Sequence, residues 1–494
     1  MIKKLCIAGG GTAGLISALY LQKAHPNTEI TIIESSKIGI IGVGEGSTEH
    51  WATFMQAVGI SRFDLIRECG ATLKSGIKFD GWRSDGKTYF HSLSEKYSIH
   101  DPYTAIPYTM MRLISENADP LETLWPTWIK SILRDPILET FSQYHFDTNK
   151  LNNYFHKLCK ERNITIIDDE IIDVNLDDHG FVSSLTGATG NVYEHDFYID
   201  STGFNRIIIS KLGAKWIDCS EQLPMNSAIA FPTGYQESLP LYTLAKAMSS
   251  GWRWRIPTQE RFGNGYVFCD AFINETEAFD EVQSEFEETI SIGKKIKFSA
   301  GYVDKCWIKN CVTVGLASMF VEPLEASSIG STIQLVRMLG PFLGLWSREN
   351  QTTVKKYNES ANLIVTNIID FIQLHYFTTR EDTEFWKWCK HNIKMTDFNK
   401  EYIDVFKNNF VNDTYFSSSP LLMFRGLNFA QVMHGLQMFN TEKIKALYQE
   451  NFNHLTQKSI QDLAFDEGYY KNIDDTVTHR EALNVMINAP KEWK

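Results

Sequence analysis

Hydrophobic and polar positions at the start of the chain follow the pattern of a βαβ unit. Residues 5–8 form an apolar run that is typical of a buried parallel strand. Residues 15–21 have the spacing of a helix, and residues 30–33 form a second apolar run that ends at Glu34. The alternation of strand, helix and strand predicts an α/β fold with a parallel sheet.

The turn between this first strand and the helix is rich in glycine. Gly9, Gly11 and Gly14 have the spacing G-x-G-x-x-G. The first glycine permits a tight turn, the second lets the backbone approach a pyrophosphate, and the third lets the helix pack on the strand. The N–H groups at the helix start then attract phosphates. We therefore predict a doubly wound, Rossmann-like dinucleotide-binding fold in which Glu34 accepts hydrogen bonds from ribose hydroxyls.

Later apolar runs predict a second sheet and a helical end of the chain. The predicted strands are residues 164–167, 171–174, 180–182, 196–200 and 313–316. The predicted helices are residues 144–161, 333–345 and 361–375. Residues 222–310 alternate apolar and polar positions, which is typical of an antiparallel sheet over a pocket. Because the strand at 313–316 would return to the first sheet, we expect residues 1–330 to interleave the dinucleotide-binding module with a sheet-containing substrate region. Residues 331–494 are expected to be mainly helical and to complete the substrate site.

Composition narrows the class of protein. The 494 residues are 43% hydrophobic and 22% charged, the balance of an ordinary globular protein. The net charge of −12 argues against nucleic acid as a partner, since nothing would neutralise its phosphates. The eight cysteines are scattered and form no C-x-x-C pair, which argues against a zinc site and for a reducing compartment. No run approaches the roughly 18 apolar residues of a membrane helix. We expect a soluble, cytoplasmic protein without a metal or a membrane partner; a homo-oligomer is compatible with the sequence.

Several short stretches resemble the flavin-dependent halogenases of the tryptophan halogenase family. The most specific is residues 251–257, GWRWRIP, which matches the W-x-W-x-I-P motif of that family. The other matching stretches are residues 9–14, 42–45, 77–82, 320–325 and 370–386. They follow the order of the family from residue 1 to about residue 390. The resemblance implies the FAD-binding fold of flavin monooxygenases.

The resemblance also implies the cofactor, the chemistry and most of the site. In this family, reduced FAD from a separate flavin reductase, oxygen and halide ion give hypohalous acid, which crosses a tunnel and halogenates an electron-rich aromatic substrate. The FAD contacts implied here are Gly9, Gly11, Thr12, Ala13, Gly14, Glu34, Gly44, Glu45 and Gly315. The tunnel wall would contain Trp252, Trp254 and Pro323. The backbone N–H groups of Ser327 and Ser328 would bind halide, although family members commonly have glycine in place of Ser328.

Lys78 and Glu325 are the residues that the resemblance makes catalytic. Alternation places Lys78 and Asp80 on one face of a strand, so a surface ion pair is the alternative for the lysine. Glu325 precedes an expected helix, so stabilisation of the first helical turn is the alternative for the carboxylate. In the catalytic interpretation, the lysine binds hypohalous acid or forms a haloamine. The glutamate, with a pKa raised by burial, polarises the oxidant or takes the proton from the substrate.

The remaining candidates concern the substrate pocket. Met110 and Met111 stand where the family has a histidine and an aromatic residue that position an indole. A methionine pair is adaptable, so we predict weak activity on free tryptophan and better activity on activated phenols, anilines or simple indoles, with bromide or iodide at least as good as chloride. Asp200 is expected near the cofactor, whereas His91 and His375 are interpreted as structural.

Two other functions remain open on the sequence alone. The first is an FAD-dependent aromatic hydroxylase of the same fold, which oxidises NADPH itself. The second is a flavoprotein without activity whose helical tail binds another protein. The tryptophan motif and the Lys78–Glu325 combination favour the halogenase.

Overall fold

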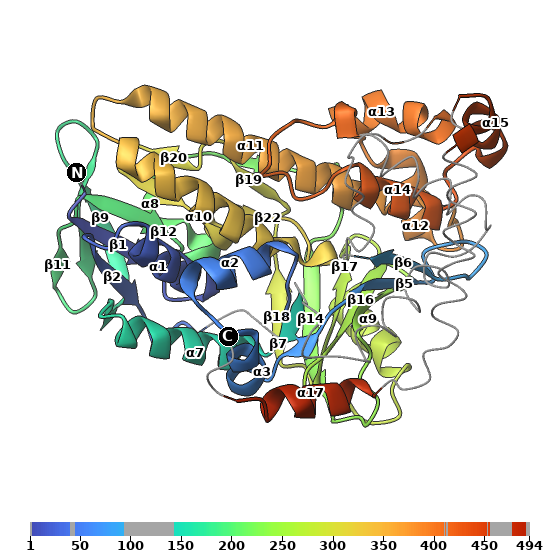
Figure 1. Cartoon of the computed structure of the whole chain (residues 1–494), viewed down its shortest axis with the longest axis horizontal. Coiled ribbons are helices and arrows are strands. Elements are labelled where there is room, and N and C mark those ends of the chain that lie inside the picture. Colours follow the sequence, from blue (N-terminus) through green and yellow to red (C-terminus); the bar gives the residue numbers. More distant parts are fainter. Residues whose placement is uncertain are drawn as a thin grey trace.

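A parallel sheet near the N-terminus carries the predicted βαβ unit (Figure 1). The computed structural model describes residues 2–39, 45–92, 143–409, 411, 413–451, 453–454 and 477–490. Strands β1 (Lys4–Ala8) and β2 (Glu29–Glu34) are parallel neighbours, and α1 (Thr12–Ala24) connects them. The apolar side chains of β1 are almost completely buried, as its uninterrupted hydrophobic run predicts.

The six strands of this sheet come from distant parts of the chain. Their spatial order is β20 (Trp307–Ile308), β21 (Cys311–Thr313), β12 (Phe197–Asp200), β1, β2 and β8 (Thr165–Asp168). All neighbours are parallel except β20 and β21. The chain leaves the sheet after β12 and returns at β20, and the segment between these strands contributes to the second large sheet. The domain boundary near residue 330 stays a prediction.

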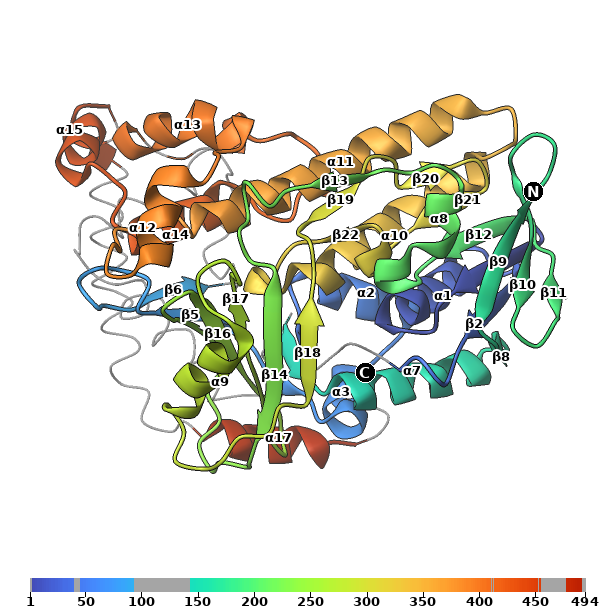
Figure 2. The same ribbon diagram turned by 180° about the vertical axis from the view of Figure 1, so that it is seen from behind.

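The second large sheet lies beside the first and has seven strands (Figure 2). Their order is β18 (Lys294–Lys297), β14 (Ser227–Thr233), β17 (Phe262–Phe268), β16 (Gly251–Pro257), β15 (Tyr242–Ala247), β5 (Gly76–Asp80) and β6 (Tyr89–Ser92). The predicted region 222–310 supplies five antiparallel strands. Strand β5 extends the sheet by pairing in parallel with β15. The sheet therefore brings the segment around residue 78 next to the W-x-W-x-I-P strand.

Three small sheets complete the strands. They are formed by β9 (Ile171–Leu176), β10 (Val182–Gly187) and β11 (Val192–Tyr193); by β13 (Trp216–Asp218), β19 (Gly301–Val303) and β22 (Met319–Phe320); and by β3 (Glu45–Gly46), β7 (Tyr144–Phe146) and β4 (Thr72–Leu73). The predicted helix at 144–161 is wrong in its first turn. Asp147 accepts hydrogen bonds from the N–H groups of Asn149 and Lys150, so helix α7 (Thr148–Glu161) begins after it.

Helices cover the sheets, and the described residues after β22 are mainly helical, as predicted for the C-terminal region (Figure 1). The early ones are α2 (His50–Val58), α3 (Arg62–Cys69), α8 (Ile207–Lys211) and α9 (Glu275–Gln283). The later ones are α10 (Ser327–Leu345), α11 (Gln351–Leu374), α12 (Glu384–Asn392), α13 (Asp397–Asn408), α14 (Gly426–Gly435), α15 (Thr441–Asn451) and α17 (His479–Ile487). Short 3-10 turns are Gly203–Asn205, Gly315–Ala317, Leu324–Ala326 and Asp413–Tyr415. Within the described residues, no helix has both the length and the apolar character needed to cross a membrane.

Helix α17 binds the part of the chain between α3 and β5. Nε2 of His479 accepts a hydrogen bond from the backbone N–H of Leu73 at 3.1 Å, and Nδ1 lies 3.2 Å from the carbonyl oxygen of Leu239. Burial lowers the pKa of His479 to about 4, so the ring is neutral and carries its proton on Nδ1. Arg67 of α3 donates to the carbonyl oxygen of Ile487 at 2.9 Å. The last described helix therefore fixes β4.

Candidate functional site

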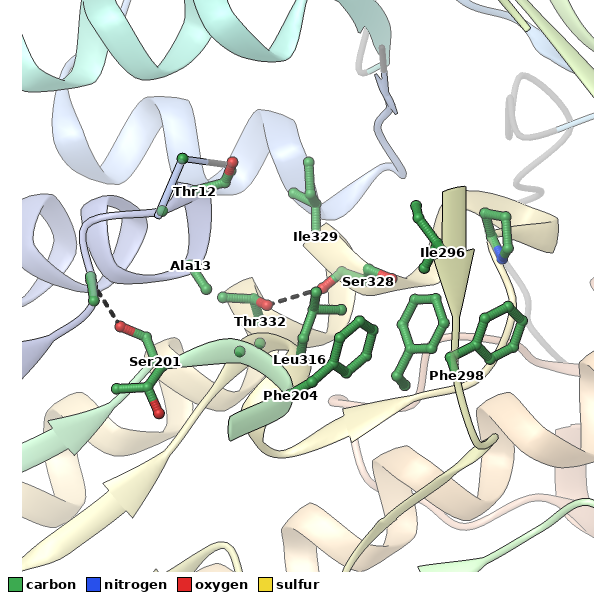
Figure 3. A pocket seen from close by; sticks show the side chains of 18 of the residues that line it. Thr12, Ala13, Ser201, Phe204, Ile296, Phe298, Leu316, Ser328, Ile329 and Thr332 are labelled. Carbon is green, nitrogen blue, oxygen red and sulfur yellow. Dashed lines mark hydrogen bonds between the residues drawn. The ribbon is translucent and has the colours of Figure 1, made fainter. Parts of the chain in front are cut away.

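One cavity of about 940 Å³ runs between the βαβ unit and the seven-stranded sheet. Its lining comes from the glycine-rich turn, the ends of β2 and β12, strands β15, β16 and β18, and the start of α10. Figure 3 shows Thr12 and Ala13 on one side of this space, Ile296 of β18 and the following Phe298 on the other, and Ser328 between them. The cavity thus joins the predicted dinucleotide site to the predicted tunnel and to Glu325.

The glycine-rich turn has the geometry that a dinucleotide requires. Gly9 has φ +103°, and its carbonyl oxygen accepts a hydrogen bond from the hydroxyl of Ser201 at 2.9 Å. A Cβ atom at Gly14 would lie 2.0 Å from the carbonyl oxygen of Gly9, so the third glycine is needed for close packing. A Cβ atom at Gly11 would meet no atom within 4 Å, because Gly11 faces the cavity. This open space beside a helix start fits a pyrophosphate.

The other predicted cofactor residues lie around the same end. Glu34 lines the cavity at the end of β2, and its Oε2 lies 3.4 Å from Nε2 of His156. Burial, together with the charge of Asp168, raises the pKa of Glu34. Gly315 has φ +65°, and a Cβ atom there would lie 2.5 Å from Cβ of Ala13.

Three further predictions for this end have different outcomes. Gly44 lies outside the described residues, and Glu45 begins β3. Asp200 is buried beneath the turn and accepts hydrogen bonds from the N–H groups of Ile208 and Ile209 at the start of α8. Its role in the fold is therefore to cap this short helix.

The predicted tunnel residues all line the cavity. Trp252 and Trp254 are buried on β16, with ring centroids 6.2 Å apart. A Cβ atom at Gly265 of β17 would lie 2.1 Å from the Trp254 ring, so glycine makes room for it. Pro323 also lines the cavity.

Glu325 also lines the cavity and is 1% exposed. Its backbone is left-handed, with φ +66°, and Ala326 follows with φ +52°. Two consecutive left-handed residues without glycine are strained, and such strain gathers at functional sites. Helix α10 begins immediately afterwards at Ser327. The left-handed turn at Glu325 and Ala326 therefore sets the direction of the carboxylate.

Two buried histidines hold the carboxylate of Glu325. Nδ1 of His91 lies 2.7 Å from Oε2, and Nε2 of His375 lies 3.0 Å from Oε1. Nδ2 of Asn428 lies 3.2 Å from the other ring nitrogen of His91, Nε2. Burial alone would raise the pKa of Glu325, but the charges and hydrogen bonds of the two histidines outweigh it and lower the pKa below its ordinary value. The expectation of a raised pKa was wrong for this reason, and the structural interpretation of His91 and His375 was incomplete.

The structure does not bring Lys78 to the cavity. Lys78 is half-buried on β5, and its Nζ lies 5.9 Å from the centroid of the Tyr242 ring. Ile77, its neighbour in the strand, is the residue that lines the cavity. Because side chains alternate along a strand, Lys78 points to the opposite face of the sheet.

A different lysine, Lys74, interacts electrostatically with Glu325. It is 1% exposed, and its Nζ donates to the carbonyl oxygen of Ser47 at 2.8 Å. A Cβ atom at Gly46, which lines the cavity, would be 3.1 Å from this Nζ. Burial lowers the pKa of Lys74 to about 8, while the carboxylates of Glu325 and Glu49 oppose the shift. The sequence analysis did not identify Lys74. The signal that could have indicated it is its position between β4 and β5, outside the alternating pattern of β5.

The predicted halide residues lie at the start of α10. Ser328 lines the cavity, and Ser327 is completely buried behind it. The first N–H groups of a helix have no partner within it, which is the reason for the halide prediction, and that prediction stays untested for Ser327 and Ser328. The predicted pocket residues Met110 and Met111 lie outside the described residues. No cluster of three or more metal-ligating side chains occurs in the described ranges.

Comparisons with known proteins agree with this arrangement. The tryptophan halogenase family model matches residues 4–450. The chain is 30% identical over 444 residues to the tryptophan 6-halogenase ThaL of Streptomyces albogriseolus, and 30% identical over 445 residues to the tryptophan 7-halogenase RebH of Lentzea aerocolonigenes. In both cases 82% of each chain is covered. Xcc4156, a flavin-dependent halogenase from Xanthomonas campestris, has a similar structure, with a TM-score of 0.86 at 26% identity over 99% of both chains. The predicted fold class is confirmed.

Proposed function

This chain belongs to the tryptophan halogenase family and is a flavin-dependent halogenase, and from this premise we propose that Lys74 and Glu325 form the pair at which hypohalous acid meets an electron-rich aromatic substrate. The observation that carries the proposal is a buried amine, next to Gly46 of the cavity lining, that interacts electrostatically with the buried carboxylate of Glu325. Lys74 takes the role that the sequence assigned to Lys78. Perturbed groups of this kind gather where chemistry occurs.

Lys74 acts on hypohalous acid through its Nζ. With a pKa of about 8, part of the lysine is a neutral amine near neutral pH. The neutral amine attacks the halogen of hypohalous acid, an N–halogen bond forms, and water leaves with the transferred proton. The charged ammonium form instead donates a hydrogen bond to the acid and polarises it. The lowered pKa favours the first route, because it supplies the lone pair that this route needs.

Glu325 acts on the proton of the aromatic carbon. When that carbon takes the halogen, the ring becomes a cation that must lose a proton to recover aromaticity. An ionised carboxylate beside the ring accepts it and returns it to the lysine nitrogen, which lost the halogen. The hydrogen bonds from His91 and His375 keep Glu325 ionised and fix both of its oxygens. In the whole reaction, the substrate gains one halogen atom and loses one proton.

The cofactor of the family is FAD, and the residues at the other end of the cavity fit it. Gly11 leaves room for the pyrophosphate, and Glu34 is placed for ribose hydroxyls. Bound in reduced form, FAD supplies the oxidising power from oxygen. The N–H groups of Ser327 and Ser328 would hold the halide ion at the start of α10, directly after the turn that contains Glu325.

An assay with a supplied reductase tests the function. We expect halogenated products, measured by mass spectrometry, when the protein is given FAD, NADH, an unrelated flavin reductase, bromide and a panel of tryptophan, indoles, phenols and anilines. We also propose that a separate reductase is the physiological source of reduced flavin, since the described residues hold one dinucleotide-type turn. The hydroxylase alternative predicts instead rapid NADPH oxidation by the protein alone, with oxygen in the product. The known relatives support halogenation over that alternative.

A further inference from the structure

A second carboxyl group is buried close to Glu325. Glu322 is 1% exposed, and its Oε1 accepts hydrogen bonds from Nε1 of Trp252 at 3.0 Å and from the hydroxyl of Tyr376 at 2.7 Å. Its Oε2 has no hydrogen-bond partner among the residues that the structure describes. A buried carboxyl oxygen without a hydrogen-bond partner destabilises the folded protein, so the presence of Glu322 at this position calls for a functional explanation.

Trp252, the partner of Glu322, belongs to the cavity wall. The neighbouring ring, Trp254, has an indole N–H without a hydrogen-bond partner in the described part of the chain. Of the two rings, Trp252 alone is tethered by a hydrogen bond there. The orientation of this part of the wall therefore depends on Glu322.

We propose that Glu322 is a positioning residue that fixes the indole of Trp252 in the cavity wall and so directs the oxidant to Lys74 and Glu325. The inference rests on the proposed function, because the wall matters only if an oxidant crosses the cavity. Glu322 acts through Trp252. If the ring turned freely, the oxidant would escape, and reduced flavin would be consumed without halogenated product.

The second donor to Glu322 connects it to the reacting carboxylate. Tyr376 directly follows His375 at the end of α11, so adjacent residues hold the two carboxyl groups. The Tyr376 ring packs edge-on against Trp82, with centroids 5.7 Å apart. The same turn of the chain therefore sets both the wall and the reacting carboxylate.

The strength of the tether depends on pH. Burial raises the pKa of Glu322 to about 7, although the hydrogen bonds from Tyr376 and Trp252 lower it. The Cys389 thiol on α12 is a further titratable group that interacts with Glu322. An ionised carboxylate accepts stronger hydrogen bonds than a neutral carboxyl group. The tether should therefore strengthen as the pH rises through about 7.

The first test follows the indole of Trp252 directly and needs no turnover. Tryptophan indoles are labelled with ¹⁵N, and the Trp252 signal among the twelve tryptophans is assigned with Trp252→Phe. We expect the Nε1–H signal to shift with pH, with a midpoint near 7. Glu322→Gln keeps Oε1 as an acceptor but cannot ionise, so its Trp252 signal should remain hydrogen-bonded and should not titrate. A signal that does not move in the natural protein, or that titrates equally in Glu322→Gln, would overturn the proposal.

The second test measures how much oxidised NADH yields product. In the natural protein, the ratio of halogenated product to NADH consumed should rise from pH 6 to 8. Glu322→Gln should keep a ratio that depends less on pH. Glu322→Leu, which removes the acceptor, should lower the ratio on the order of tenfold while NADH consumption continues. If Glu322→Leu does not fold, the Gln variant alone decides the outcome. Absence of product from the natural protein, with the titration intact, would count against the proposed function and not against the tether.

Discussion

The Nζ of Lys74 donates a hydrogen bond to the backbone carbonyl oxygen of Ser47 at 2.8 Å. Ser47 is itself held on two sides by Tyr144: the Ser47 N–H donates to the carbonyl oxygen of Tyr144, and the Tyr144 N–H donates to the Ser47 hydroxyl, each at 2.8 Å. A lysine side chain normally keeps much rotamer freedom, which burial removes. The amine is thus fixed in place before any substrate arrives.

Replacement of Lys74 by Ala should lower the rate of halogenation by a factor on the order of 10²–10⁴, the scale of losing an acid–base or nucleophilic group. Flavin binding, measured by absorbance titration, should be unchanged, because Lys74 does not lie at the dinucleotide end. Lys78→Ala is the matched control and should keep its activity. If Lys78 is essential and Lys74 is dispensable, the catalytic role belongs to Lys78, as the sequence analysis predicted.

The haloamine route predicts a rate that rises with pH. Lys74 has a pKa near 8, so its neutral fraction grows between pH 7 and 9. The halogenation rate should rise over this interval. Glu49 raises the pKa of Lys74, so Glu49→Gln should move the midpoint to lower pH. A rate that falls over the same interval would favour the ammonium form as the active species.

Gly46→Ala should disturb the amine without disturbing the cofactor. The added Cβ would lie 3.1 Å from Nζ of Lys74, which must move by a few tenths of an ångström. We expect a loss of about tenfold in rate, equivalent to about 1.4 kcal/mol. Gly344→Ala on α10 adds the same methyl group to open space and serves as the control. Equal rates for both variants would show that the amine tolerates displacement.

Gly11→Ala should separate folding from cofactor binding. The added Cβ meets no protein atom within 4 Å, and the extended backbone at Gly11 suits alanine. The melting temperature of the protein without FAD should therefore be unchanged, while the dissociation constant for FAD should rise. A lowered melting temperature without FAD would mean that Gly11 serves the fold and not the ligand.

Local patterns predicted the parts of the fold that local forces determine. The βαβ unit follows from two apolar runs and a glycine turn, and all three features act within residues 4–34. The strand containing Trp252 and Trp254 was found from its motif. The strand at Tyr144–Phe146 was missed because its formation depends on pairing with β3 and β4, far away in the sequence.

The site was less predictable because its groups meet only in the folded chain. His91 and His375 contact Glu325 across sequence separations of 234 and 50 residues, and no local pattern reports such contacts. The same histidines reverse the expected shift in the pKa of Glu325. Lys78 was predicted because it lies in the matched stretch 77–82, and only the folded sheet shows that its side chain points away from the cavity.

The hydrogen bond between Leu73 and His479 spans 406 residues and holds the residue that precedes Lys74. During synthesis, the dinucleotide-binding turn is therefore complete long before the amine acquires its final support. A chain interrupted before α17, or clipped there by a protease, would retain the residues that bind flavin but lack the anchor of β4. We expect such a fragment to lose halogenation, because β4 and the lysine that follows it are no longer held in place.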